Sequence, residues 1–287
     1  MGGERLWIAP ERNFYYENPR DFEGFHVPAG MDPGNYEGSD DLTYVNTYTL
    51  MDLKSNQLAE GTTMQRSFAP CDDPYGTGLA FAGTTIRDSI TVPGAELDFC
   101  AWSLAQIYTC GAANPGTVLF PIKEQGQILN YFDPIPAGRA EVKQGYGRFR
   151  IDAADIYKMG IAPEDMLFDN ECKSVYVSPY PGVDRWFCVI KRSNDMPRSQ
   201  QECVDYPKSN PEGTKGATQA YNNGPDFPLG PDFPFGEIEM QLAKGVRTGD
   251  TTVSSGEHQL LAYAGAKEEI LKLAATALGT RDMPEVY

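Results

Sequence analysis

In the stretch Phe235–Leu242 (FGEIEMQL), polar and apolar positions alternate from Glu237 onward. Its polar positions, Glu237, Glu239 and Gln241, fall on one side of an extended chain, and its apolar positions fall on the other. Alternation with a period of two is typical of a strand that buries one face. The pattern therefore predicts a strand over Gly236–Ala243 with an acidic face that is either exposed to water or part of a site.

Other short segments have the composition of strands, because they are rich in Val, Ile, Thr, Tyr or Phe and are bounded by Gly, Pro, Asn or Asp. They are Arg5–Ala9, Thr43–Leu53, Gln57–Ser67, Gly83–Val92, Val118–Ile122, Arg148–Ile151, Ser174–Pro179, Trp186–Lys191, Ala217–Asn222 and Gln259–Tyr263. Many strands with few helices predict an all-β sandwich or barrel.

One segment, Gly265–Leu278, has helical spacing, and Gly279 follows it as a predicted C-cap. Three long segments, Glu11–Asp41, Asn194–Lys215 and Asn223–Pro234, have the composition of loops, and loops of this length in a compact domain are often binding loops or lids. No linker or shift in composition divides the chain, so we expect a single domain over residues 1–287.

The charge of the chain restricts its partners. With 40 acidic and 24 basic residues the formal net charge is −16, so nucleic acid and anionic membranes are poor partners for this surface. No apolar run is long enough to span a bilayer, and the first residues lack the features of a signal peptide. These features favour a cytoplasmic protein, or an exported one whose leader has been removed, and leave the oligomeric state open.

Metal and disulfide chemistry have little support in the sequence. The six cysteines form no C-x-x-C pair, and His26 and His258 are the two histidines, so a zinc site is not expected. Free, mostly buried thiols are the simplest interpretation, although an even count leaves disulfides open for a secreted protein.

The acidic face of Phe235–Leu242 could carry chemistry. Residues two apart on one face of a strand lie about 6.5–7 Å apart, so Glu237 and Glu239 would repel each other if partly desolvated. Such repulsion raises the pKa of one carboxyl group and suits it to general acid–base catalysis. The alternative is a water-facing row of acids, which is common on an acidic protein.

Several short motifs resemble one family. The opening GGERLWIAPE (residues 2–11) is similar to the GGxRLWxxPE stretch of a branch of the galactose mutarotase-like (aldose 1-epimerase-like) superfamily. Further similar motifs occur in the same order: TVLFPIK (Thr117–Lys123), RIDAADIYKMGI (Arg150–Ile161), QAYNNGP (Gln219–Pro225), GEIEMQ, and a predicted turn at SSGEH (Ser254–His258). The resemblance implies a β-supersandwich of two large antiparallel sheets, with a sugar or oligosaccharide bound on a concave face and no metal or cofactor.

The resemblance also implies roles for individual residues. Ile238–Gln241 (IEMQ) resembles the strand of sugar mutarotases whose glutamate is the base at the anomeric hydroxyl, which makes Glu239 the candidate base. Arg5 resembles an arginine that lines the sugar site. The histidines that these enzymes use in mid-chain have no counterpart here, and His26 is the candidate second catalytic group, whereas His258 is expected to be structural.

Other residues are candidates for holding a sugar through aromatic stacking, charge or hydrogen bonds. They are Trp7, Arg12, Tyr15, Tyr16, Lys123, Asn222 and Glu237. We expect Glu239 and Arg5 to share one concave pocket with at least one of Arg12, Tyr15, Tyr16 or His26.

Three classes of function remain open. The first is an aldose 1-epimerase-like isomerase based on Glu239. The second is a lyase that acts on a uronate-containing polysaccharide, and the third is a non-catalytic sugar-binding protein that has kept the cleft. Glycoside hydrolysis is least expected, because two carboxylates on one strand cannot easily flank a glycosidic bond.

Overall fold

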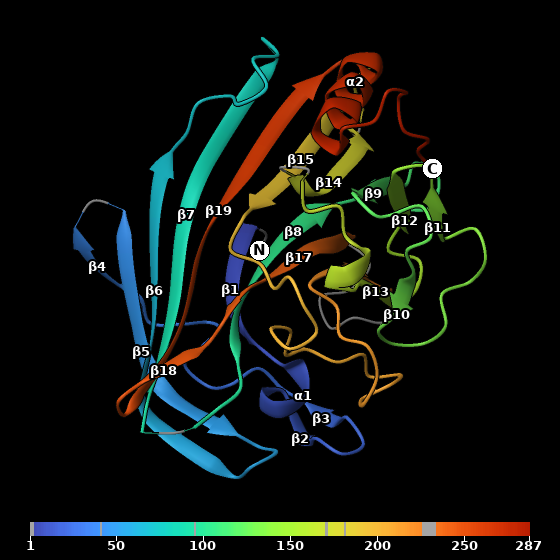
Figure 1. Cartoon of the computed structure of the whole chain (residues 1–287). Helices are drawn as coiled ribbons and strands as arrows, with labels where there is room; N and C mark the ends of the chain where they lie inside the picture. Colours follow the sequence, from blue (N-terminus) through green and yellow to red (C-terminus); the bar gives the residue numbers. More distant parts are fainter. Residues whose placement is uncertain (1–2, 41, 95, 170–171, 181, 226–233) are drawn as a thin grey trace.

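Two large antiparallel sheets make up most of the protein in the computed structural model, which describes residues 3–40, 42–94, 96–169, 172–180, 182–225 and 234–287 (Figure 1). The smaller sheet has six strands in the order β1 (Gly3–Ala9), β8 (Cys100–Tyr108), β17 (Phe235–Lys244), β16 (Thr218–Asn222), β13 (Tyr157–Ile161) and β10 (Ile128–Asn130). The all-β fold class predicted from the strand pattern is confirmed.

The larger sheet has eleven strands and bends away from the smaller one at its β4 end (Figure 1). Its strand order is β11 (Ala140–Lys143), β12 (Tyr146–Ile151), β9 (Gly116–Phe120), β14 (Cys172–Pro179), β15 (Trp186–Ser193), β19 (Thr251–Gly265), β7 (Ala80–Pro93), β6 (Gln57–Pro70), β5 (Thr43–Asp52) and β4 (Glu37–Asp40), with β18 (Val246–Thr248) beside β19. A separate hairpin joins β2 (Tyr16–Asn18) to β3 (Glu23–Phe25).

In the described part of the chain the helices are few and lie outside the sheets (Figure 1). They are α1 (Glu11–Phe14), the 3₁₀ turn η1 (Pro163–Asp165) and α2 (Lys267–Leu278). The predicted C-terminal helix is confirmed: α2 buries Ile270 and Leu273 against the outer face of the larger sheet, and Gly279 ends it at φ +69°. None of the helices in the described ranges combines the length and apolar character needed to cross a bilayer.

The main core lies between the two sheets. Ile238, Met240 and Leu242 of β17 belong to the same buried cluster as Met64 of β6 and Ile90 of β7. The alternation in FGEIEMQL thus places the apolar side chains where it predicted them, in the core.

Three strands of the smaller sheet, β8, β10 and β13, were not predicted. β8 (CAWSLAQIY) is buried on both faces and so has no alternation to detect, and β13 lies inside the RIDAADIYKMGI motif. The predicted turn at SSGEH is wrong, because Ser254–His258 lies within β19. Gly256 there allows a close approach: a Cβ atom on it would lie 3.0 Å from the Cβ atom of Asp195.

Most of the predicted loop Asn223–Pro234 lies outside the described residues, which resume at Pro234. The six cysteines lie within the described ranges and each is a free thiol, as the simplest interpretation of the sequence predicted.

Candidate active site on the six-stranded sheet

Strand register gathers polar side chains on one face of the smaller sheet. Gln106 of β8 pairs directly with Glu237 of β17, which pairs with Tyr221 of β16, which in turn pairs with Lys158 of β13. Side chains that are direct cross-strand partners lie on the same face. This face is the one opposite the apolar side chains of β17, so it points away from the larger sheet.

A second row runs beside the first. Arg5 of β1 pairs with Leu104 of β8, and Leu104 pairs with Glu239 of β17. Trp7 and Trp102 are direct partners one step further along the same face. The two rows bring residues that are more than 200 positions apart in sequence onto one surface.

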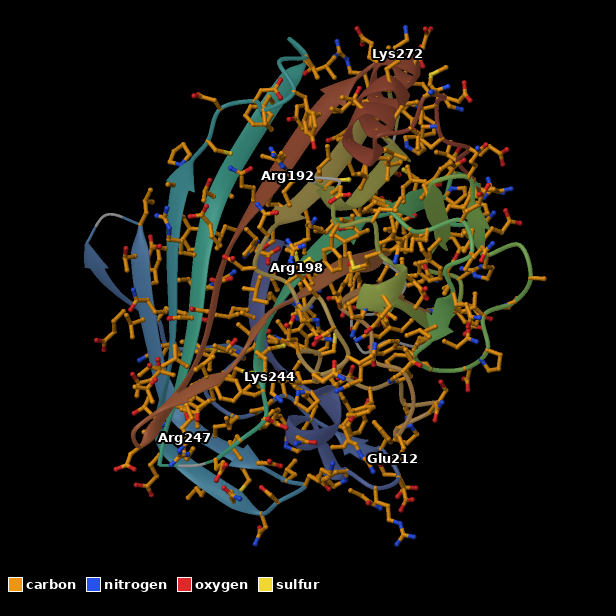
Figure 2. All side chains as sticks on the ribbon, in the orientation of Figure 1. Arg192, Arg198, Glu212, Lys244, Arg247 and Lys272 are labelled. Carbon is orange, nitrogen blue, oxygen red and sulfur yellow. The ribbon has the colours of Figure 1, made fainter. Side chains whose placement is uncertain are left out.

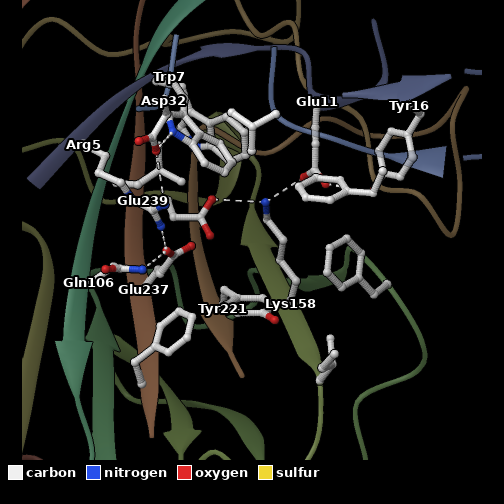
Figure 3. A pocket seen from close by; sticks show the side chains of 17 residues that line it. Arg5, Trp7, Glu11, Tyr16, Asp32, Gln106, Lys158, Tyr221, Glu237 and Glu239 are labelled. Carbon is white, nitrogen blue, oxygen red and sulfur yellow. Dashed lines mark hydrogen bonds and ion pairs between the residues drawn. The ribbon is translucent and has the colours of Figure 1, made fainter. Parts of the chain in front are cut away.

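These rows form the floor of a cavity of about 460 Å³, which Figure 3 shows from close by. Its cover comes from α1, the β2–β3 hairpin and the segment that follows, which contribute Glu11, Tyr16, Phe25, Val27 and Asp32. The aromatic side chains that line it are Trp7, Tyr16, Phe25, Trp102, Phe132, Tyr221 and Phe235. The cavity is therefore mostly apolar, with charged groups at a few fixed positions.

Lys158 joins two of the acidic residues. Its ammonium nitrogen lies 3.1 Å from Oε2 of Glu239 and donates a hydrogen bond of 3.0 Å to Oε2 of Glu11 (Figure 3). The other oxygen of Glu11 accepts a 2.8 Å hydrogen bond from the Tyr16 hydroxyl. The ammonium also lies 4.3 Å from the centre of the Trp102 ring. This side chain is 3% exposed, so its charge is balanced almost entirely by these buried neighbours.

The environment of Glu239 favours its protonated form. Burial raises its pKa most, the nearby Lys158 lowers it, and Glu237 and Glu11 raise it again, which gives a pKa of about 8. For Lys158, burial alone would lower the pKa, but attraction by Glu11 and Glu239 outweighs burial and raises it. Lys158 therefore stays charged while Glu239 can gain or lose a proton near neutral pH.

A third buried acid lies behind this pair. Asp205 accepts hydrogen bonds of 2.8 Å from the backbone N–H of Glu11 and from the side-chain amide of Gln219. Burial raises its pKa most, Lys158 lowers it and Glu11 raises it, which gives a pKa of about 6. Asp205 holds the start of α1 in place and so fixes where the Glu11 carboxylate meets Lys158.

Arg5 holds the acidic residues at the other end of the cavity. Its guanidinium forms a short ion pair with Glu237 and lies 3.4 Å from Oδ2 of Asp32. Asp32 also accepts a 2.8 Å hydrogen bond from the Trp7 indole, and Glu237 accepts one of 3.3 Å from Gln106. The positive charge of Arg5 is therefore balanced by Glu237 and Asp32 within the protein.

Five of the residues proposed from the sequence line the cavity together. They are Arg5, Trp7, Tyr16, Glu237 and Glu239. The acidic row of β17 is not a water-facing surface, since Glu237 is 7% exposed and Glu239 is 1% exposed.

Arg12 and Tyr15 do not line the cavity. The Arg12 guanidinium points to Glu212, which is exposed at the lower edge of Figure 2, and forms a 3.1 Å ion pair with it. Tyr15 is fully buried, stacks on the Trp7 ring at 5.0 Å between centroids, and accepts a hydrogen bond from the Ile8 backbone. Tyr15 thus supports the wall of the cavity without facing it.

His26 and Lys123 also lie away from it. The His26 ring contacts the carbonyl of Gly24 at 3.2 Å, and the residues on either side of His26, not His26 itself, reach the cavity. Lys123 donates to the carbonyl of Glu164, near η1. Neither side chain lines the cavity.

Asn222 and His258 have structural partners. The Asn222 side-chain oxygen accepts a 2.7 Å hydrogen bond from the backbone N–H of Asp152 and so joins β16 to the end of β12. His258 is buried between the sheets 3.0 Å from Asp88, which agrees with the structural role expected of it.

Lys158, Glu11, Asp32 and Gln106 were missed as site residues. Lys158 lies in the motif RIDAADIYKMGI and Glu11 in the motif GGERLWIAPE, so the motifs were a signal that could have identified both residues. Asp32 lies in a loop and Gln106 in a strand without alternation, and the sequence has no signal for either. No group of three or more His, Cys, Asp or Glu among the described residues could hold a metal ion.

The known proteins compared with this chain are at most weakly similar to it. No protein-family model and no curated protein matches the chain. A galactose mutarotase-like protein from Lactobacillus casei is 10% identical, with 91% of this chain and 84% of that chain covered and a TM-score of 0.39. Winged bean acidic lectin, solved with methyl-α-D-galactose, is 8% identical, with 91% and 99% covered and a TM-score of 0.16. At these TM-scores neither likeness assigns a function to this chain.

Proposed function

We propose that this chain binds a neutral sugar in the cavity on the six-stranded sheet and interconverts its anomers, as an aldose 1-epimerase does. The observation that carries the proposal is Glu239, a buried carboxyl group in an aromatic-walled cavity with a pKa of about 8. A general acid–base group works best when its pKa lies near the pH at which it operates.

The walls of the cavity suit a sugar. Trp7 and Trp102 offer large apolar surfaces that can pack on the C–H face of a pyranose ring, and the polar floor offers groups for its hydroxyls. The volume of about 460 Å³ is within the range of small-molecule sites, roughly 300–1,000 Å³. A monosaccharide or the terminal unit of an oligosaccharide fits this description.

The charges of the cavity favour a neutral sugar over a uronate. A lyase needs a cation that can neutralise the carboxylate of its substrate. The cations among the described lining residues are Arg5, paired with Glu237 and Asp32, and Lys158, paired with Glu11 and Glu239. Bringing a further carboxylate beside four acids would be unfavourable, so the lyase alternative has no specific observation in its favour.

The test is the rate of anomer exchange. Freshly dissolved α-glucose, α-galactose and a panel of other aldoses are followed by polarimetry with and without the protein, and binding is measured in parallel by tryptophan fluorescence. We expect acceleration of at least one sugar and a loss of at least 100-fold in the Glu239→Gln variant, since acid–base groups contribute about 10²–10⁴-fold.

The controls separate the remaining classes. Glu268→Gln changes an exposed glutamate that pairs with Lys272 on α2, and it should leave the rate unchanged. Binding without acceleration would leave a sugar-binding protein, and a rise in ultraviolet absorbance with uronate polymers would replace the proposal by the lyase.

A further inference from the structure

The proposed function, on which this inference rests, requires proton transfers at the two oxygen atoms bonded to the anomeric carbon. To open a pyranose ring, the ring oxygen must gain a proton and the anomeric hydroxyl must lose one. Two separate groups, an acid and a base, are the usual solution. Among the described residues that line the cavity, Glu239 is the carboxyl group that accepts no hydrogen bond, although it is ion-paired with Lys158, and no histidine lines the cavity.

Apart from the Trp102 indole N–H, which is too weak an acid to give up its proton, the other polar side chains that line the cavity already have partners. The Tyr16 hydroxyl donates to Glu11 at 2.8 Å, and the Tyr221 hydroxyl donates to the side chain of Asn223 at 2.8 Å. The pKa of Lys158 is raised, so its ammonium is a poor proton donor. None of these groups is placed as the missing acid.

Glu239 differs from them. Both of its carboxyl oxygens are buried and neither makes a hydrogen bond with another described residue, although the Lys158 ammonium lies 3.1 Å from Oε2. A protonated carboxyl group carries one O–H donor and keeps an acceptor oxygen. The positive charge of Lys158 makes Oε1 the preferred place for the proton in the resting state, so Oε1–H is the donor and Oε2 the acceptor when the ring opens.

We propose that Glu239 acts as an undissociated carboxylic acid and performs both proton transfers itself. Oε1–H gives its proton to the ring oxygen while Oε2 takes the proton of the anomeric hydroxyl. The bond between C1 and the ring oxygen breaks, its electron pair stays on the ring oxygen, and the O–H pair of the anomeric hydroxyl becomes the second bond of the aldehyde. The carboxyl group ends with its proton on Oε2, so no charge is created.

The return step uses the same two oxygens. After the aldehyde turns about the C1–C2 bond, the ring hydroxyl attacks its other face, Oε2–H protonates the aldehyde oxygen, and Oε1 takes the proton from the attacking hydroxyl. The two reacting oxygens are bonded to the same carbon in the ring form, so a single carboxyl group can span them. A second catalytic residue on the far side of the sugar is then unnecessary.

The protonation state of Glu239 agrees with this scheme, because its pKa of about 8 keeps it mainly protonated at neutral pH. The charged groups around it come from several elements and from the loop before β16. They are Arg5 of β1, Glu11 of α1, Asp32, Lys158 of β13, Asp205 and Glu237 of β17.

The pH dependence of anomer exchange tests the inference. After subtraction of the spontaneous rate at each pH, kcat/KM should be constant at pH 6–7 and fall about tenfold per pH unit above 8. A carboxylate base would give the opposite profile, rising to a plateau above pH 8, and that result would overturn the inference while leaving the proposed function intact. Absence of acceleration for every aldose would overturn both.

Two further measurements test whether Glu239 performs both proton transfers. Rates in mixtures of H₂O and D₂O should depend quadratically on the deuterium fraction, because two protons move together, and a linear dependence would contradict the scheme.

Glu239→Gln keeps a donor and an acceptor in place, but an amide N–H is too weak an acid to transfer its proton. This variant should bind the sugar with a similar KM and lose kcat, with Glu268→Gln as the matched control.

Discussion

Burial makes the negative charge of Glu239 unfavourable. The free energy of unfolding should therefore depend on pH even when no substrate is bound. Its pKa in the folded protein is about 8, against an ordinary value of 4.5. A raised pKa means that the folded state binds the proton more tightly than the unfolded state does. The resulting stabilisation is complete below pH 4.5 and is lost as the pH rises to about 8.

Replacing Glu239 with Gln removes this titration. Relative to the wild type, the free energy of unfolding of Glu239→Gln should therefore rise with pH between 4.5 and 8, by about 1.4 kcal/mol per pH unit at most. Urea unfolding of both proteins at pH 5, 6, 7, 8 and 9 measures the difference. A difference that does not change with pH would show that Glu239 titrates alike in the folded and unfolded states.

Lys158 should be needed most when both of its partners are charged. Lys158→Met leaves Glu11 and Glu239 buried without a cation, and breaking a buried pair costs about 3–5 kcal/mol. We expect a loss of this size at pH 8 and a smaller one at pH 5, where Glu239 is protonated. Adding Glu239→Gln to Lys158→Met should recover part of the loss at pH 8, and equal losses at both pH values would argue against the charge balance.

At the scale of elements, β17 shows how far a sequence pattern can lead. The alternation predicted the strand, its two faces and the core position of Ile238 and Met240. It could not decide whether Glu239 was exposed, because burial depends on the cover provided by α1 and the β2–β3 hairpin, which lie far away in sequence. Alternation indicates orientation within a strand but contains no information about what packs on each face.

Lys158 was missed for a related reason. A single lysine in a short strand is usually a solvated side chain. Its role follows from the register of β13 and β16 and from the position of Glu11, and both are long-range features. The lining residues that the sequence identified were found from local patterns in β1, β2 and β17, whereas those it missed acquire their roles through contacts between strands and loops.

A second buried polar cluster joins the two sheets behind the cavity. Lys191 of β15 contacts Glu4 of β1 at 3.2 Å, donates to the Ser103 hydroxyl at 2.6 Å, and lies 3.5 Å from the carbonyl of Ile238. That carbonyl stands between Glu237 and Glu239 in the chain. The cluster therefore anchors the stretch of β17 that carries both carboxyl groups.

Breaking this cluster should destabilise the protein. Glu4→Gln leaves the Lys191 charge buried with neutral partners, and we expect it to lower the free energy of unfolding by about 3 kcal/mol. Urea unfolding at pH 7 measures the loss. The double variant Glu4→Gln with Lys191→Met removes both charges and should be more stable than Glu4→Gln alone. If it is less stable, the two side chains do not act as a buried pair.

For the whole molecule, opposite shifts of pKa set the range of pH in which it is stable. Burial opposes the ionisation of Asp152, but hydrogen bonds from Arg139 and Arg150 outweigh burial and lower its pKa to about 2. Burial is likewise outweighed at Asp88, where His258 and Arg66 lower the pKa. A lowered pKa stabilises the folded state above the ordinary value, and this is lost as the pH falls below about 4.

These aspartates and Glu239 act at opposite ends of the range, because Glu239 costs stability as the pH rises toward 8. We therefore expect the greatest stability near pH 4–5, with cooperative acid unfolding at lower pH as Asp88 and Asp152 gain protons. Asp152→Asn should be less stable than the wild type at pH 6 by about 1–2 kcal/mol, and the gap should close near pH 2. Thermal unfolding followed by circular dichroism from pH 2 to 7 measures both curves. A gap that persists at pH 2 would show that Asp152 acts through hydrogen bonds of the neutral group and not through its charge.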